Sequence, residues 1–182
     1  MDPFATLGID RRFDVDLNAT EKRYRELSRT LHPDRYTHAG PSERRAALSK
    51  AVEVNEAWRT LKDPITRAEA LFSLAGVTVG ERNEPAPSPA LLMEAMELRE
   101  TLAEAKDKKD LAAIEHLAGE VDARRRDVEE KLRAGFAASA ADKRKVTALV
   151  PLLGELRFHR RFLDEVSAIE DALAESAVVR EA

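Results

Sequence analysis

Apolar residues recur through most of the chain at the three- and four-residue spacing of amphipathic helices. The first long run carries its apolar residues at Leu17, Tyr24, Leu27 and Leu31. A second run opens at Ser42 and continues through Ala47, Ala51, Val54, Trp58 and Leu61. Two such helices joined by a short polar loop predict an antiparallel hairpin, in which the apolar faces pack together and the loop lies exposed at the tip.

The loop between these runs contains the tripeptide His32-Pro33-Asp34. Pro33 has a fixed φ, lacks a backbone N–H and disfavours helical conformation in the residue before it, so the first helix is predicted to end at about Leu31. His32 and Asp34 then lie on a stiff, exposed corner. Taken alone, the tripeptide is better explained as a turn, with the proline as breaker and the aspartate as cap.

Shorter elements flank the predicted hairpin. Residues 3–9 form one helical turn that ends at Gly8, and Asp16 or Asn18 caps the first long helix. After the hairpin, Asp63-Pro64 has the pattern of an N-cap followed by a first-turn proline, which predicts a further helix over 65–75.

The chain changes character at residues 77–88, which are polar, rich in proline and without helical periodicity. We interpret them as a constrained linker. Helical patterns then cover, in order, about 89–106, 109–135 and 141–176. Their short connections favour an antiparallel three-helix bundle. Pro151 and Gly154 lie inside the third pattern; we expect Pro151 to kink that helix or to begin it anew, and Gly154 to lower its helicity.

The helix that begins at Pro89 carries apolar residues on two faces. One face, predicted to fill the bundle core, consists of Leu91, Ala95, Leu98 and Leu102. The other side presents Leu92, Met93 and Met96, which either pack against another part of the chain or form a surface for a partner. Methionine suits such surfaces because its side chain is flexible and polarizable.

Composition narrows the possibilities. Charged residues make up 35% of the 182 residues and aromatics only 5%, which favours a mostly helical protein with a modest core. There is no cysteine, which excludes disulfides, thiolate metal sites and thiol nucleophiles. A net charge of −4 argues against general nucleic-acid binding. No apolar run reaches the roughly 20 residues of a membrane span, and the first residues lack a secretory signal pattern, so we expect a cytoplasmic protein.

No constellation of residues points to catalysis. The sequence contains no glycine-rich phosphate loop, nucleophile elbow or His-Glu-x-x-His zinc motif, and we predict no enzyme activity, no cofactor and no metal site. His32 and His38 share one loop, but without cysteine they make a poor metal site. His116 and His159 are interpreted as residues on a helix surface or boundary.

The sequence around the tripeptide, residues 22–35 followed by residues 54–64, resembles a J domain. In that family the His-Pro-Asp loop and the basic face of the preceding helix dock on a chaperone ATPase of the heat-shock class and stimulate ATP hydrolysis. The resemblance therefore implies a chaperone-binding site made of Lys22, Arg25, Arg29, His32, Pro33, Asp34 and Arg35. Without the neighbouring loop, the basic residues are better explained as an ordinary solvated face with intrahelical ion pairs.

Two further stretches, residues 67–76 and 90–100, resemble the iron–sulfur co-chaperones of the HscB type. This resemblance implies a J domain at 1–76, the linker at 77–88 and a scaffold-binding bundle at 89–182. Carried over by position, the residues that would bind the iron–sulfur scaffold protein are Leu92, Met93, Met96, Glu97, Arg99, Glu100 and Phe158. Met96 stands where a leucine is common, a change that preserves volume and apolarity.

The sequence thus predicts an all-α, two-domain co-chaperone. It would stimulate an HscA/DnaK-type chaperone ATPase and deliver to it an IscU-type iron–sulfur scaffold protein, without itself holding the cluster. One alternative is a J-domain co-chaperone for a different client; another is a helical adaptor with no ATPase partner. No nucleic acid or membrane is expected among its partners.

Overall fold

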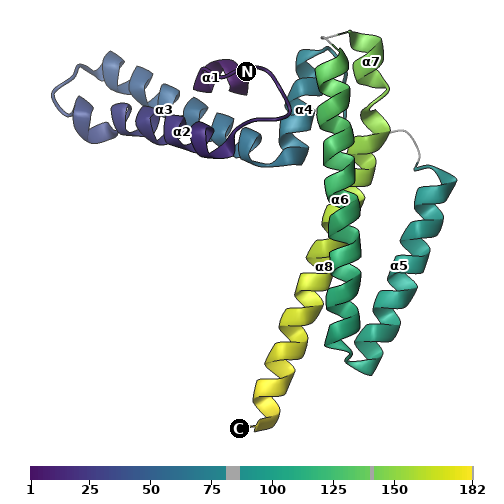
Figure 1. Cartoon of the computed structure of the whole chain (residues 1–182). Coiled ribbons are helices and arrows are strands. Elements are labelled where there is room, and N and C mark those ends of the chain that lie inside the picture. Colours follow the sequence, from purple (N-terminus) through teal and green to yellow (C-terminus); the bar gives the residue numbers. More distant parts are fainter. Residues whose placement is uncertain (81–86, 140–141, 182) are drawn as a thin grey trace. The chain divides into compact units, whose positions relative to one another are not determined.

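The structure, a computed structural model, describes residues 1–80, 87–139 and 142–181, with side chains described as far as residue 175 (Figure 1). Every regular element in these residues is helical, and the elements are α1 (Pro3–Leu7), α2 (Leu17–Thr30), the 3₁₀ helix η1 (Pro33–Tyr36), α3 (Pro41–Lys62), α4 (Pro64–Leu74), α5 (Pro89–Lys108), α6 (Leu111–Ser139), α7 (Lys143–Thr147) and α8 (Val150–Glu181). The predicted all-α class is confirmed. Of the predicted linker, residues 81–86 lie outside the described residues. None of the described helices is both long and apolar enough to cross a bilayer.

The helices form two compact units. The first contains Met1–Val79 together with Arg133–Thr147, and the second contains Gly80–Leu132 together with Ala148–Ala182. The end of α6 and all of α7 therefore belong to the first unit, which the sequence analysis did not predict. The division of the chain into domains at 1–76 and 89–182 remains a prediction.

The first unit is built on the hairpin of α2 and α3, which lie side by side in Figure 1. The Asp16 carboxylate caps α2 by accepting from the Ala19 N–H at 3.0 Å. Between the two helices, the Tyr24 and Trp58 rings stack with centroids 5.5 Å apart, and the Tyr24 hydroxyl donates to Asn55 Oδ1 at 2.9 Å. These contacts fix the two helices against each other and so fix the tip between them.

Burial in the first unit follows the predicted pattern better on α3 than on α2, where Tyr24, Leu27 and Leu31 are only half-buried. Fully or almost fully buried side chains include Phe4, Leu7, Ala47, Val54, Leu61 and Phe72. Leu17, which we predicted on the apolar face of the hairpin, is 43% exposed. Leu17 is the first residue of α2, so the periodicity extended the buried face to the very end of the helix, where it does not hold.

Aromatic rings join the end of α6 to the rest of the first unit. The Phe136 ring lies 5.1 Å from Phe72, edge to face, and 5.9 Å from Phe13, stacked. The Arg67 guanidinium lies 4.9 Å above the Phe13 ring and donates to the Leu61 carbonyl at 2.7 Å. Ring pairs of this geometry stabilise beyond their buried area, which accounts for the membership of residues 133–147 in this unit.

The second unit consists of α5, the first part of α6 and α8, which run antiparallel in turn (Figure 1). Its buried core is formed by Leu98, Leu102, Ala105, Ile114, Leu117, Val121, Phe162 and Val166. Leu98 and Leu102 are buried as predicted, whereas Leu91 and Ala95 are only half-buried. The core of the bundle therefore contacts the C-terminal half of α5 more than its N-terminal half.

The third helical pattern is two helices rather than one. The chain forms the short α7, turns at residues 148–149 and starts α8 at Val150. Pro151 thus lies in the first turn of α8, where its missing N–H would have no helical partner. Of our two expectations for Pro151, a kink or a new start, the new start is correct. Gly154 lies inside α8 beyond this first turn.

Replacing Gly154 with alanine should stabilise the protein. A Cβ built at Gly154 meets no heavy atom within 4 Å, and alanine in a helix interior is favoured over glycine by about 0.5–1 kcal/mol. The measurement is the midpoint of urea unfolding. Gly76→Ala is the matched control with the opposite sign, because Gly76 has φ +71°, where a side chain costs about 1–2 kcal/mol. A lower midpoint for Gly154→Ala would contradict the helical assignment.

Charged side chains on α6 form a ladder along the helix. Asp122 contacts Arg125 at 2.7 Å and Arg126 at 2.5 Å, and Arg125 also pairs with Glu129. The hydrogen bond from Arg125 lowers the pKa of the Asp122 carboxyl below its ordinary value of 3.8; the charges of Arg125 and Arg126 act in the same direction, while desolvation opposes them.

Asp122→Asn should therefore destabilise the protein in a pH-dependent way. Because the folded pKa is depressed, the carboxylate contributes stability above the unfolded pKa and loses it as the pH falls through the folded value. Two intrahelical pairs suggest a loss of about 0.5–1 kcal/mol at pH 7. Urea midpoints of wild type and variant, compared from pH 7 downward, should converge below pH 3.8. A constant difference over that range would exclude an ionic origin.

Candidate functional sites

The hairpin tip has a defined local structure. His32 is extended, with φ −61° and ψ 134°, and caps η1, whose first residue is Pro33. The Asp34 N–H donates to His32 Nδ1 at 3.3 Å, and the Asp34 carboxylate lies 3.4 Å from the same nitrogen. When the ring is neutral, Nδ1 is thus the acceptor and Nε2 carries the proton. The side chains remain 58% and 86% exposed, so the corner presents an N–H donor and a carboxylate to a partner.

Basic side chains lie on the helix before this corner and in η1. All seven residues predicted to bind a chaperone are exposed. Arg25 is paired with Glu21 at 2.7 Å, whereas Lys22, Arg29 and Arg35 have no ion pair with any described residue. Unpaired surface cations act mainly on the rate and salt dependence of association with an acidic surface. The tip therefore combines a polar corner of fixed geometry with positively charged side chains on the preceding helix.

A second surface lies on the N-terminal half of α5. The Ser88 hydroxyl fixes the start of this helix by accepting from the Leu91 N–H at 3.1 Å. Leu92, Met93 and Met96 are 51%, 63% and 72% exposed. We call these three residues the apolar strip. Their exposure excludes the alternative that they pack inside the second unit, and apolar groups left in water favour association with a partner.

The other residues predicted for this surface differ in exposure. Glu97, Arg99 and Glu100 are exposed on α5. Phe158, on α8, is half-buried, and its ring centroid lies 6.4 Å from that of Phe162 in the bundle core. Phe158 therefore has an exposed part and a part fixed by packing, as suits a rigid aromatic at the margin of a binding surface.

His159 is buried, contrary to our interpretation of it as a surface or boundary residue. Only 4% of its side chain is exposed, and its ring centroid lies 5.5 Å from that of Phe158. Its Nε2 lies 3.5 Å from the Glu94 carboxylate, which also binds Arg124 at 2.7 Å. The sequence contained no signal for this cluster, because its members come from three helices.

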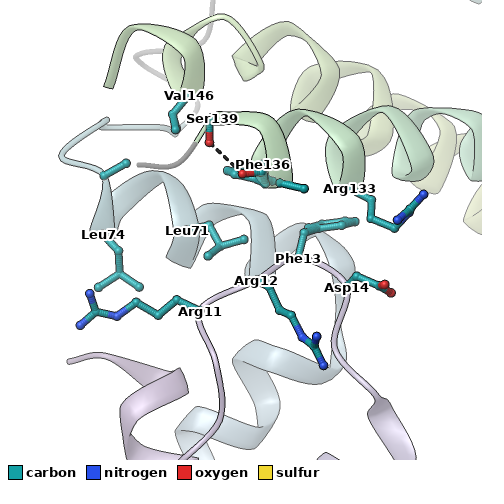
Figure 2. Close-up of a pocket in the computed structure, with 12 residues that line it drawn as sticks. Arg11, Arg12, Phe13, Asp14, Leu71, Leu74, Arg133, Phe136, Ser139 and Val146 are labelled. Carbon is teal, nitrogen blue, oxygen red and sulfur yellow. Dashed lines mark hydrogen bonds between the residues drawn. The ribbon is translucent and has the colours of Figure 1, made fainter. Parts of the chain in front are cut away.

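The sequence analysis also did not predict a cavity in the first unit. Figure 2 shows its lining, in which Phe13, Leu71, Phe136 and Val146 supply apolar side chains and Arg11, Arg12 and Arg133 supply charge. Its volume is about 540 Å³. None of the predicted site residues lines it. In the part of the chain that the structure describes, no three acidic or histidine side chains gather as a metal site would require.

Comparison with known families matches both halves of the sequence. A family model described as the DnaJ domain matches residues 2–70, and one described as the HSCB C-terminal oligomerisation domain matches residues 87–167. A co-chaperone protein HscB homolog of Bordetella petrii is 41% identical over 131 residues, which are 72% of this chain and 76% of that protein. The homolog of Ralstonia nicotianae is 42% identical over 142 residues, 76% and 81% of the two chains. The chain belongs to the HscB co-chaperone family.

Solved HscB structures share the fold. Chaperone HscB from Vibrio cholerae matches with a TM-score of 0.82 and 32% identity, over 95% of this chain and 99% of that one. Human co-chaperone protein HscB also matches with a TM-score of 0.82, at 25% identity, over 93% and 82% of the chains. The DnaJ match contains the hairpin tip, and the HSCB match contains the apolar strip and Phe158. The resemblance read from the sequence is confirmed at the level of the family.

Proposed function

We propose that this HscB-family co-chaperone stimulates the ATPase of an HscA/DnaK-type chaperone with its hairpin tip and presents an IscU-type iron–sulfur scaffold protein on its apolar strip. The observation that carries the proposal is the exposure of two chemically different surfaces, one polar and one apolar, in two compact units of one chain.

The tip suits a partner that must be contacted in one geometry. His32, Pro33 and Asp34 are held by the proline and by the contact between the first and third of these residues. A corner fixed before binding loses little conformational entropy when it docks. The cations of α2 lie on the preceding helix and would speed the encounter with an acidic face of the ATPase.

The strip suits a partner with an apolar surface. Burying exposed apolar area contributes roughly 25 cal/mol per Å², and the charged residues Glu97, Arg99 and Glu100 lie exposed on the same helix. An apolar centre with polar residues around it is the usual composition of a protein interface. Phe158 would contribute the rigid aromatic contact.

Joining the two surfaces in one chain explains the proposed role physically. A scaffold protein bound to the second unit is present at the chaperone at a high effective concentration whenever the tip is docked. ATP hydrolysis would then fix the chaperone on a client that is already in place. The iron–sulfur cluster stays with the scaffold as cargo, in keeping with a chain that has no cysteine to bind it.

His32→Gln should abolish most of the stimulation, by at least tenfold, in a steady-state ATPase assay with the chaperone. The side chain is 58% exposed, so the thermal midpoint should stay unchanged. His38→Gln is the matched control, because His38 is also exposed in the connection between α2 and α3. Full stimulation by His32→Gln, or none by the wild type, would favour a helical adaptor with no ATPase partner.

Replacing Leu92, Met93 and Met96 together with alanine should weaken scaffold binding by about ten- to a hundredfold, because apolar anchors of this kind each contribute on the order of 1 kcal/mol. Calorimetry gives the affinity. Stimulation of the ATPase without scaffold should persist, while synergy between scaffold and co-chaperone is lost. Leu111→Ala, which removes a leucine 47% exposed in the same unit, serves as control. Unchanged affinity of the triple variant would favour a different client.

A further inference from the structure

The apolar strip lies on the least anchored part of α5. From Pro89 to Glu97 no side chain is buried, and the first buried residue of the helix is Leu98. In Figure 1, α5 approaches α6 at its C-terminal end and diverges from it toward its N-terminal end. The hydrophobic core therefore does not by itself hold the turns that carry the strip.

One polar cluster connects these turns to both other helices of the second unit. The Glu94 carboxylate lies 2.7 Å from the Arg124 guanidinium of α6 and 3.5 Å from Nε2 of His159 on α8. Glu94 is 31% exposed, so the carboxylate is partly screened from water, and an ion pair there is stronger than one on an open surface. Long side chains thus bridge the helices where their backbones diverge.

The burial of His159 indicates that this contact has a purpose beyond packing. Its Nδ1 is buried and has no hydrogen-bond partner among the described residues. An unpaired buried nitrogen is unfavourable, and an apolar side chain of similar size would fill the same space without that cost. Compared with such a side chain, histidine adds the contact of its Nε2 with Glu94. His159 directly follows Phe158 in the chain, so this contact lies next to Phe158.

We propose that Glu94 is a positioning residue: by binding Arg124 and His159 it holds the first half of α5, and with it the apolar strip, in a fixed relation to Phe158 on α8. This inference rests on the proposed function, in which the strip and Phe158 form one scaffold-binding surface. If the strip is correctly placed in only a fraction of molecules, the apparent dissociation constant rises by the inverse of that fraction.

Amide hydrogen exchange, measured on the protein without its partners, tests directly whether Glu94 holds the first half of α5 in place. Glu94→Ala should speed exchange of the amides of residues 92–97 by about five- to tenfold, and leave the amides of residues 114–121 in α6 unchanged. Glu104→Ala is the matched control, because among the described residues Glu104 pairs with Lys108 of the same helix alone, and its side chain is 63% exposed. Unchanged exchange in Glu94→Ala would overturn the proposal, whatever the scaffold does.

Scaffold affinity supplies the second readout. Glu94→Ala should raise the dissociation constant about five- to tenfold. Adding Arg124→Ala should raise it little further, because both substitutions remove the same contact between α5 and α6. Additive losses, with exchange at residues 92–97 unaffected, would mean that Glu94 contacts the scaffold directly. A wild-type protein that binds no scaffold would contradict the proposed function. The exchange experiment would still decide whether Glu94 holds the first half of α5.

Variants of His159 separate positioning from packing. His159→Leu should keep or raise the thermal midpoint, since it removes the unpaired nitrogen, and yet speed exchange at residues 92–97 and weaken scaffold binding. His159→Gln places an amide donor near Nε2 and should restore much of the affinity. Equal behaviour of the two variants in exchange and binding would overturn the role of the histidine contact.

Discussion

A helix in a three-helix bundle can bury only the face that it turns toward its neighbours, and α5 carries more apolar side chains than that face holds. Leu98 and Leu102 fill the core, while Leu92, Met93 and Met96 remain in water. Leaving them exposed forgoes stabilisation that burial would supply. We propose that another molecule covers these side chains, and this proposal underlies the functional interpretation of the second unit.

The hairpin tip reaches exposure by a different physical route. There the backbone conformation causes the exposure. Pro33 cannot continue α2, His32 is forced into an extended conformation, and η1 turns the chain toward α3. Polar side chains on such a corner lose nothing by facing water. One surface therefore owes its availability to a backbone restriction, and the other to an excess of apolar residues, so the two can be altered independently by substitution.

Local signals predicted most of the fold from the sequence. Caps and prolines act within one turn of the helix they start. The sequence therefore predicted a cap at Asp16 or Asn18 and another at Asp63, and the side chains of Asp16 and Asp63 cap α2 and α4. Angular spacing placed the strip on a second face of α5, but it did not decide between internal packing and exposure. The assignment of its residues to a scaffold, in contrast, came from family resemblance, because periodicity says that a face is apolar but not what covers it.

Features that depend on contacts between distant residues could not be predicted. Phe136 packs on Phe72 and Phe13, so the end of α6 belongs to the first unit although its helical pattern continues without a break from the second. His159 lies at a position that periodicity left ambiguous, and its burial depends on which helices surround it. The break between α7 and α8 had a local signal in Pro151, but a proline alone does not distinguish a kink from a new start.

A binding surface benefits from adaptable side chains and from a fixed backbone, and on α5 different residues supply these two properties. Methionine side chains rotate easily and adapt to the shape of a partner, which increases the number of surfaces they can contact. The same freedom is a disadvantage if the backbone beneath them also moves, because both kinds of disorder must be lost on binding. A carboxylate held from two neighbouring helices limits the backbone and leaves the thioethers free. Adaptable side chains on a fixed helix thus lose less entropy than adaptable side chains on a frayed one, and Glu94 is the residue placed to make that difference.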